Sequence, residues 1–127
     1  MENGENLEVT YFGDYITKGN KKYIIYKEYE EGNPNNYSFC VIRVEKNLVS
    51  LTKNKKYQTK IILEKGLRHY SPYYTDYGLI TMNVYTHDIK DELEDFGGSL
   101  NVSYSINFNT ELLNVMDVTV NVEKINK

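Results

Sequence analysis

Carboxylates in pairs are the side chains of this sequence that come closest to a catalytic set. Glu28 and Glu30 share one face of a predicted strand, and four acids lie between Asp91 and Asp95. Glycoside hydrolysis needs two carboxyls that face each other across a cleft, which spacing along one strand does not provide. We interpret Asp91 to Asp95 as a solvated edge that blocks strand pairing. Glu28 shares its face with Ile24 and Tyr26, so it needs a cation if that face is internal. The candidate partners are Arg43, Lys53 and Arg68.

The other nucleophilic or metal-binding side chains are sparse. His69 and His87 are the only histidines, and a metal site needs further ligands at set spacing. Cys40 lies on an apolar strand face, where a thiol behaves as a small apolar side chain. We therefore predict no catalytic residue, no metal site and no cofactor. An enzyme is the third hypothesis, and it requires contact between Glu28, Arg68 and His69.

Basic residues gather in the middle of the chain, at Lys53, Lys55, Lys56, Lys60, Lys65 and Arg68. Barrels bind single-stranded nucleic acid by combining a basic groove with stacking aromatics. The formal net charge of −3 weighs against such a partner, and hairpin tips are often rich in lysine for solubility. The alternative hypothesis is an interaction module for RNA, a protein or a second copy, which uses the surface 53–68. Its candidate residues are Lys53, Lys55, Lys56 and Lys60.

Tyrosines crowd the segment from Tyr70 to Gly78. Tyrosine has an apolar face and a polar tip, which suits a barrel mouth or an interface. Two interpretations stay open: a lid at a ligand entrance, or a plug in a barrel filled by its own side chains. The leading hypothesis is a non-catalytic barrel that binds a small, partly apolar ligand. The candidate ligand-binding residues are Tyr26, Glu28, Arg68, Tyr70, Tyr73, Tyr77 and Tyr104.

The elements that must position these residues are strands. The chain contains no Ala, the best helix former, and apolar residues alternate with polar ones between turn residues. The loop Glu31 to Asn36 is the clearest break, and Ile89 to Glu94 fits either one helical turn or an edge strand. The predicted strands are 7–11, 22–30, 37–45, 48–53, 57–63, 67–71, 78–86, 100–108 and a last one around 116–122.

Short strands joined by short loops predict one all-β domain over residues 1–127. A meander of this length must curl or split to protect its edges, so we predict a closed antiparallel up-and-down barrel of about 8–10 strands. A Greek-key sandwich is the alternative. The single cysteine and the lack of a secretory signal or a long apolar run predict a cytoplasmic protein without a membrane partner, either a monomer or a homodimer.

Between residues 51 and 108 the chain resembles the YwiB-like proteins, a bacterial family of unknown function. The resemblance rests on the motif Tyr73-x-Thr75-x-Tyr77-Gly78, on a Met/Val strand that ends in Thr86, and on the pair Gly97-Gly98 before a strand that contains a tyrosine. The chain departs from the family pattern at three positions: Lys53 replaces Arg, Asn54 replaces Gly and Asp76 replaces Pro. The resemblance implies a calycin-type, lipocalin-like barrel, and it implies no substrate, cofactor or catalytic residue.

Overall fold

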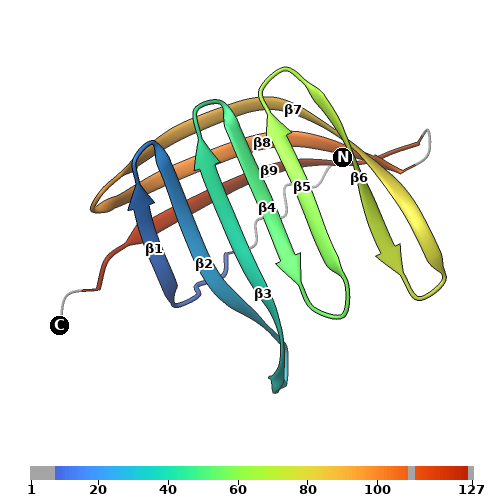
Figure 1. The fold of residues 1–127 in the computed structure, drawn as a ribbon, viewed down its shortest axis with the longest axis horizontal. Coiled ribbons are helices and arrows are strands. Elements are labelled where there is room, and N and C mark those ends of the chain that lie inside the picture. The colour runs from blue at the N-terminus through green and yellow to red at the C-terminus, as the bar shows by residue number, and fades with distance from the viewer. Residues whose placement is uncertain (1–7, 109–110, 126–127) are drawn as a thin grey trace.

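The computed structural model describes residues 8–108 and 111–125, and most of them lie in antiparallel strands (Figure 1). The strands are β1 (Gly13–Lys18), β2 (Lys21–Glu30), β3 (Asn33–Glu45), β4 (Leu48–Asn54), β5 (Gln58–Glu64), β6 (Arg68–Thr75), β7 (Gly78–Glu94), β8 (Gly97–Phe108) and β9 (Glu111–Glu123). No helix that could cross a membrane occurs among the described residues.

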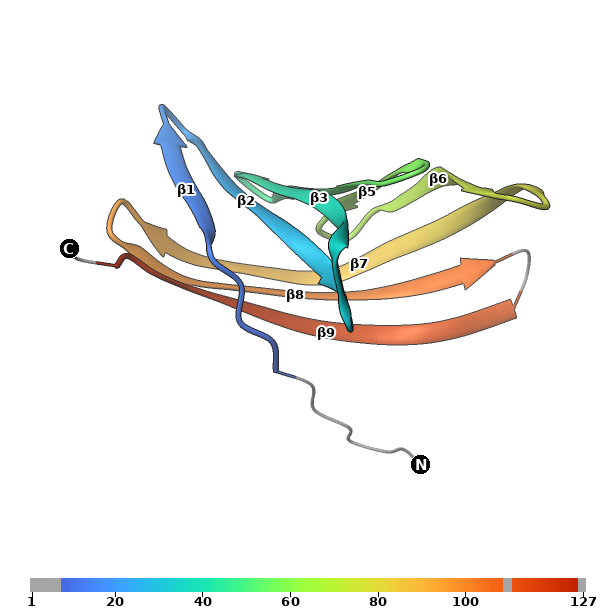
Figure 2. The ribbon, with the colours of Figure 1, turned by 90° about the horizontal axis from the view of Figure 1, so that it is seen from below.

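The strands form two sheets in chain order, β1-β2-β3-β4-β5 (sheet A) and β6-β7-β8-β9 (sheet B). The prediction of an antiparallel meander is confirmed. The prediction of a closed barrel is wrong, because the described strands pair within two separate sheets and β1 does not pair with β9. Sheet A lies over one face of sheet B (Figure 2).

The separation into two sheets arises at the corner between β5 and β6. Gly66 has φ +79° there, a conformation that glycine adopts without strain. Its N–H donates to the Thr86 carbonyl at 2.9 Å, and Thr86 N–H donates to the Leu67 carbonyl at 3.2 Å. These bonds use the backbone groups that a continuous sheet would pair, so the chain leaves sheet A and β6 starts beside β7.

The core lies between the two sheets. Its buried members are Ile42, Val44, Val49, Leu63, Met82, Val84, Leu93, Leu100, Val102 and Tyr104. The predicted alternation of β8 is confirmed, since Leu100, Val102 and Tyr104 are all buried. Met116, Val118, Val120 and Val122 of β9 pack against the same core and are half-buried, because β9 is the edge of sheet B.

Several predicted boundaries are wrong. Residues 8–12 are not a strand, and β1 begins only at Gly13. The predicted loop Glu31 to Asn36 shrinks to a two-residue turn, since Gly32 takes φ +77° and β3 starts at Asn33. For the segment 89–94, the strand alternative is confirmed and the helical turn is wrong, since β7 continues through a bulge between Thr86 and Asp88.

The tyrosine-rich segment is also mostly strand. β6 runs to Thr75, and the turn holds only Asp76 and Tyr77. Thr75 fixes this turn, since its hydroxyl donates to the Gly78 carbonyl at 2.8 Å and accepts from Tyr77 N–H at 3.1 Å. The predicted lid or plug is therefore a regular hairpin, which lies beside β5 in Figure 1.

Candidate functional site

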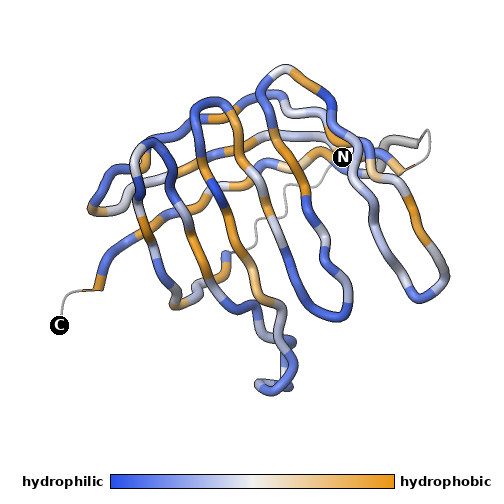
Figure 3. Tube along the Cα trace, in the orientation of Figure 1, coloured by the Kyte–Doolittle hydropathy of each residue, from blue (hydrophilic) through white to orange (hydrophobic). Residues whose placement is uncertain are grey.

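The inner face of sheet A changes from apolar to polar along its strands. One cross-strand row consists of Ile24, Ile42, Leu51 and Ile61, and the next consists of Tyr26, Cys40, Lys53 and Thr59. Glu28 and Ser38 pair in the row beyond. Hydropathy along the strands changes in the same direction (Figure 3). The polar end of this face is the part of sheet A that offers hydrogen-bonding groups.

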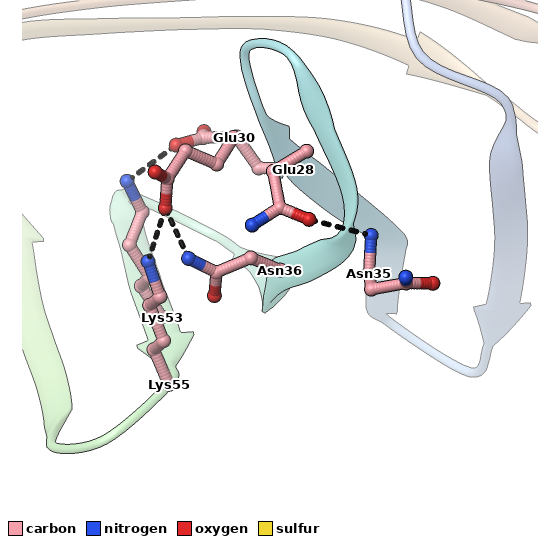
Figure 4. A network of polar contacts seen from close by, with 7 residues as sticks. Glu28, Glu30, Asn35, Asn36, Lys53 and Lys55 are labelled. Carbon is pink, nitrogen blue, oxygen red and sulfur yellow. Dashed lines mark hydrogen bonds and ion pairs between the residues drawn. The ribbon is translucent and has the colours of Figure 1, made fainter.

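Glu28 and Lys53 form an ion pair at this polar end, with Nζ and Oε1 2.7 Å apart. Glu28 lies on β2 and Lys53 on β4, and the small side chains of Ser38 and Cys40 on the intervening β3 leave room for the contact. Lys53 is thus the partner of Glu28 among the three cations that the sequence offered. Figure 4 shows this pair beside a second one, in which Lys55 lies 3.2 Å from Glu30.

Burial changes the acidity of the groups around this ion pair. Burial raises the pKa of Tyr26 well above its ordinary value, and Cys40 and Glu28 raise it further. Burial and then Glu28 raise the pKa of the Cys40 thiol as well. Burial lowers the pKa of Lys53, but the hydrogen bond and charge of Glu28 outweigh it, so the pKa is raised overall. Tyr26 and Cys40 are therefore protonated at neutral pH, and Cys40 is a poor nucleophile.

Beside Tyr26 lies a hollow of about 410 Å³, which we call the aromatic hollow. Tyr11 stacks on Tyr26 there, with ring centroids 4.9 Å apart and planes 28° apart. Gly13 allows this arrangement, since a Cβ at Gly13 would press on the Ile25 carbonyl oxygen. The hollow is lined by Thr10, Tyr11, Phe12, Gly13, Asp14, Ile25, Tyr26, Lys27, Tyr29 and Phe39. Five aromatic rings with one acid and one base make this site mainly apolar.

A second hollow, of about 660 Å³, lies at the opposite end of sheet A. Turn residues and charged side chains line it, and Lys22 and Asp91 in its wall pair with each other at 3.0 Å. Tyr15 donates to the Glu94 carbonyl nearby at 2.7 Å. Both contacts connect sheet A to sheet B, so the charged groups here hold the fold together.

The predicted ligand-binding residues do not gather in one place. Tyr26 and Glu28 lie together on sheet A, while Tyr104 is a core residue of sheet B with 5% of its surface exposed. The remaining four lie on the β6–β7 hairpin. Arg68 donates to Asn83 at 2.6 Å, Tyr73 lies 5.8 Å from the Phe108 ring, Tyr70 is exposed, and Tyr77 is fully exposed.

The predicted interaction surface is largely neutralised by acids. Besides the pairs of Lys53 and Lys55, Lys56 lies 2.8 Å from Asp76 and Lys65 lies 3.2 Å from Asp88. Lys60 has no ion pair with any residue that the structure describes. A nucleic-acid backbone is bound by cations that exchange counterions for phosphates, and these lysines already face carboxylates. This pairing weighs against RNA as the partner.

The groups required for the enzyme hypothesis lie apart. Glu28 pairs with Lys53, Arg68 bonds Asn83, and His69 Nε2 lies 2.9 Å from Glu64 Oε1. Over residues 8–108 and 111–125, no three His, Cys, Asp or Glu side chains are grouped to hold a metal ion.

Sequence reasoning missed the aromatic hollow. Its walls include Tyr11, Phe12 and Phe39, none of which is among the residues predicted for a site. Adjacent Tyr11 and Phe12 cannot both face the core of a strand, and Gly13 follows them. The pair of adjacent aromatic residues followed by a glycine is the sequence signal that the strand does not continue through this point.

The comparisons with known proteins concern the family and the fold. The family model for a domain of unknown function, DUF1934, matches residues 1–120. No curated protein matches the chain. Among solved structures, the ywiB protein from Bacillus subtilis is similar, with a TM-score of 0.70 and 19% identity over 98% of this chain and 85% of that one. At this identity the likeness shows the fold alone, and it confirms the resemblance to YwiB-like proteins. The chain belongs to the DUF1934 family, whose function is unknown.

Proposed function

We propose that the protein is a non-catalytic, calycin-like open barrel that binds a small, partly apolar ligand in the aromatic hollow. The observation that carries this proposal is the hollow itself, of about 410 Å³ beside the stacked rings of Tyr11 and Tyr26. Small-molecule sites commonly occupy about 300–1,000 Å³, with mainly apolar walls and a few polar groups. Asp14 and Lys27 supply the polar groups here.

The chemistry of the walls favours a flat ring as the ligand. Aromatic side chains bind such rings by stacking or edge contacts, which are worth about 0.5–1.5 kcal/mol beyond area burial. Tyr26 contributes a phenol that stays protonated and can donate a hydrogen bond.

The buried Cys40 supports the predicted location in a reducing compartment, the cytoplasm.

An NMR screen of ring-containing fragments against the isotope-labelled protein tests the proposal. We expect shifts confined to residues 10–14, 25–29 and 39, and a loss of affinity of about tenfold in Phe12→Ala. Phe12 is 80% exposed, so this variant keeps its stability. Tyr70→Ala is the matched control, since Tyr70 is also an exposed aromatic but lies on β6. Shifts that map to the β6–β7 hairpin, or no binding across the library, would refute the aromatic hollow as the site.

A further inference from the structure

The outer face of sheet A, which points away from sheet B, has more apolar residues than a solvated sheet face. Two neighbouring rows cross all five strands. They are Ile16, Tyr23, Arg43, Ser50, Ile62 and Asp14, Ile25, Val41, Thr52, Lys60. Half of these ten positions are apolar or aromatic, whereas a solvated antiparallel face is normally polar.

This face is free in the described part of the chain. Figures 1 and 2 show no strand over it. Ile16 is exposed, as is Phe39 in the next row, and Tyr23, Ile25, Val41 and Ile62 remain half-buried. Contiguous apolar surface of this kind usually marks an interaction site.

The charges at the ends of the rows identify the partner. Asp14 on β1 and Lys60 on β5 end the same row, and Ile16 and Ile62 end the other. A two-fold axis along β3 would place β1 of one copy over β5 of the other. Asp14 would then face Lys60, and Ile16 would face Ile62, twice in each dimer. Neither Asp14 nor Lys60 has an ion pair with another described residue.

The centre of the face is compatible with the same axis. Arg43 would approach its own copy, but Glu45 of the same chain lies 2.8 Å from it and balances its charge. Val41 and Phe39 supply the apolar middle. Five strands about 4.8 Å apart span about 19 Å, so two such faces bury on the order of 1,000 Å², the lower limit of a specific interface.

We propose that the outer face of sheet A binds a second copy of this chain, in a face-to-face dimer with sheets packed along aligned strands. Its self-complementary ends, with acid on β1 and base on β5, favour a copy over an unrelated protein. The dimer and the proposed ligand share part of one surface, because Asp14, Ile25 and Phe39 also line the aromatic hollow. Lys60 lies outside the hollow, so Lys60→Glu tests the dimer without altering the ligand site.

Charge exchange tests this dimer. Sedimentation of the full chain over a range of concentrations should show a monomer–dimer equilibrium. Asp14→Lys and Lys60→Glu should each raise its dissociation constant about tenfold or more, because like charges then face each other. The double variant Asp14→Lys/Lys60→Glu should restore dimerisation, because opposite charges face each other again.

Two further variants test the centre of the interface and serve as a control. Val41→Asp at the centre should abolish the dimer, whereas Leu79→Asp, at a residue 59% exposed on β7, should leave it intact. Circular dichroism checks that each variant folds. A wild-type chain that stays monomeric at every concentration would overturn the proposal. So would a double variant that dimerises more weakly than either single variant.

Discussion

Gly98 offers a test of how tightly the backbone packs where β7 turns into β8. It has φ +131°, and a Cβ added there would press on the Glu92 carbonyl oxygen. Gly78, at the start of β7, has nearly the same φ, +133°, but no heavy atom lies within 4 Å of its added Cβ. Gly78→Ala and Gly98→Ala therefore introduce the same backbone strain, and only Gly98→Ala adds a steric clash.

The expected magnitudes follow from this difference. A side chain at such a φ costs about 1–3 kcal/mol, so Gly78→Ala should lose about that amount of unfolding free energy. Gly98→Ala should lose about 1–3 kcal/mol more, because overpacking against a backbone carbonyl has no rotamer to relieve it. At this chain length 1 kcal/mol corresponds to about 3–5 °C in Tm.

Thermal and urea unfolding of the wild type and the two variants measure the effect. We expect Gly98→Ala to unfold about 3–15 °C below Gly78→Ala. Equal losses in the two variants would mean that the β7–β8 turn moves aside to admit a methyl group. The close approach to Glu92 would then not be a constraint on the fold.

The other predictions concern the core, the ion pair and two titrating groups. Leu63→Ala should lose about 2–5 kcal/mol in urea unfolding, because the side chain is fully buried, while Leu67→Ala at an exposed site should change stability by less than about 0.5 kcal/mol. A double-mutant cycle of Glu28→Gln and Lys53→Met should give a coupling of about 0.5–1 kcal/mol that weakens in high salt, since both groups are partly exposed. Hydrogen bonds from Lys56 and Tyr57 hold the pKa of Asp76 below its ordinary 3.8, so this contact stabilises the fold above pH 3.8 and is lost as the pH falls through the lowered pKa. In Lys56→Met the Asp76 carboxyl should titrate closer to 3.8 by NMR. Burial raises the pKa of Tyr26 above its ordinary 10.0, so its contribution is present below pH 10 and is lost above it, and Tyr26→Phe should flatten the fall of stability with pH in alkaline unfolding experiments.

Local pattern predicted much of the fold. The alternation from Leu100 to Phe108 predicts a half-buried strand, and β8 spans these residues. Ile62 follows Ile61 and so breaks the alternation of its strand, and the structure places it on the outer face of sheet A, the face of Lys60. The position at which one sheet becomes two was not predictable from pattern, because it depends on the backbone hydrogen bonds that join Gly66 and Leu67 to Thr86.

The candidate site was less predictable because it depends on register. The sequence required a cation for Glu28 and left three candidates. Only the pairing of β2, β3 and β4 places Lys53 beside it, across Ser38 and Cys40. A shift of one residue in either pairing would turn one of the two charges to the other face of the sheet. Turn lengths fix this register, and the turn at Gly32 is four residues shorter than the loop we predicted there.

The tyrosine-rich hairpin shows why aromatic content alone misplaced the ligand site. Tyr70 and Tyr74 face one side of sheet B, and Tyr73 faces the other, because successive side chains of a strand alternate between its two faces. Asp76 at the tip accepts from Tyr57 at 2.9 Å and pairs with Lys56, which ties the hairpin to the β4–β5 turn. A regular hairpin that is hydrogen-bonded to the neighbouring turn acts neither as a plug in a barrel nor as a lid over a ligand entrance. Just before β1, by contrast, the segment 8–12 brings Tyr11 onto Tyr26, so rings from this segment, β2 and β3 meet around one hollow. A binding site needs this convergence of strands, which a run of tyrosines on one strand cannot supply.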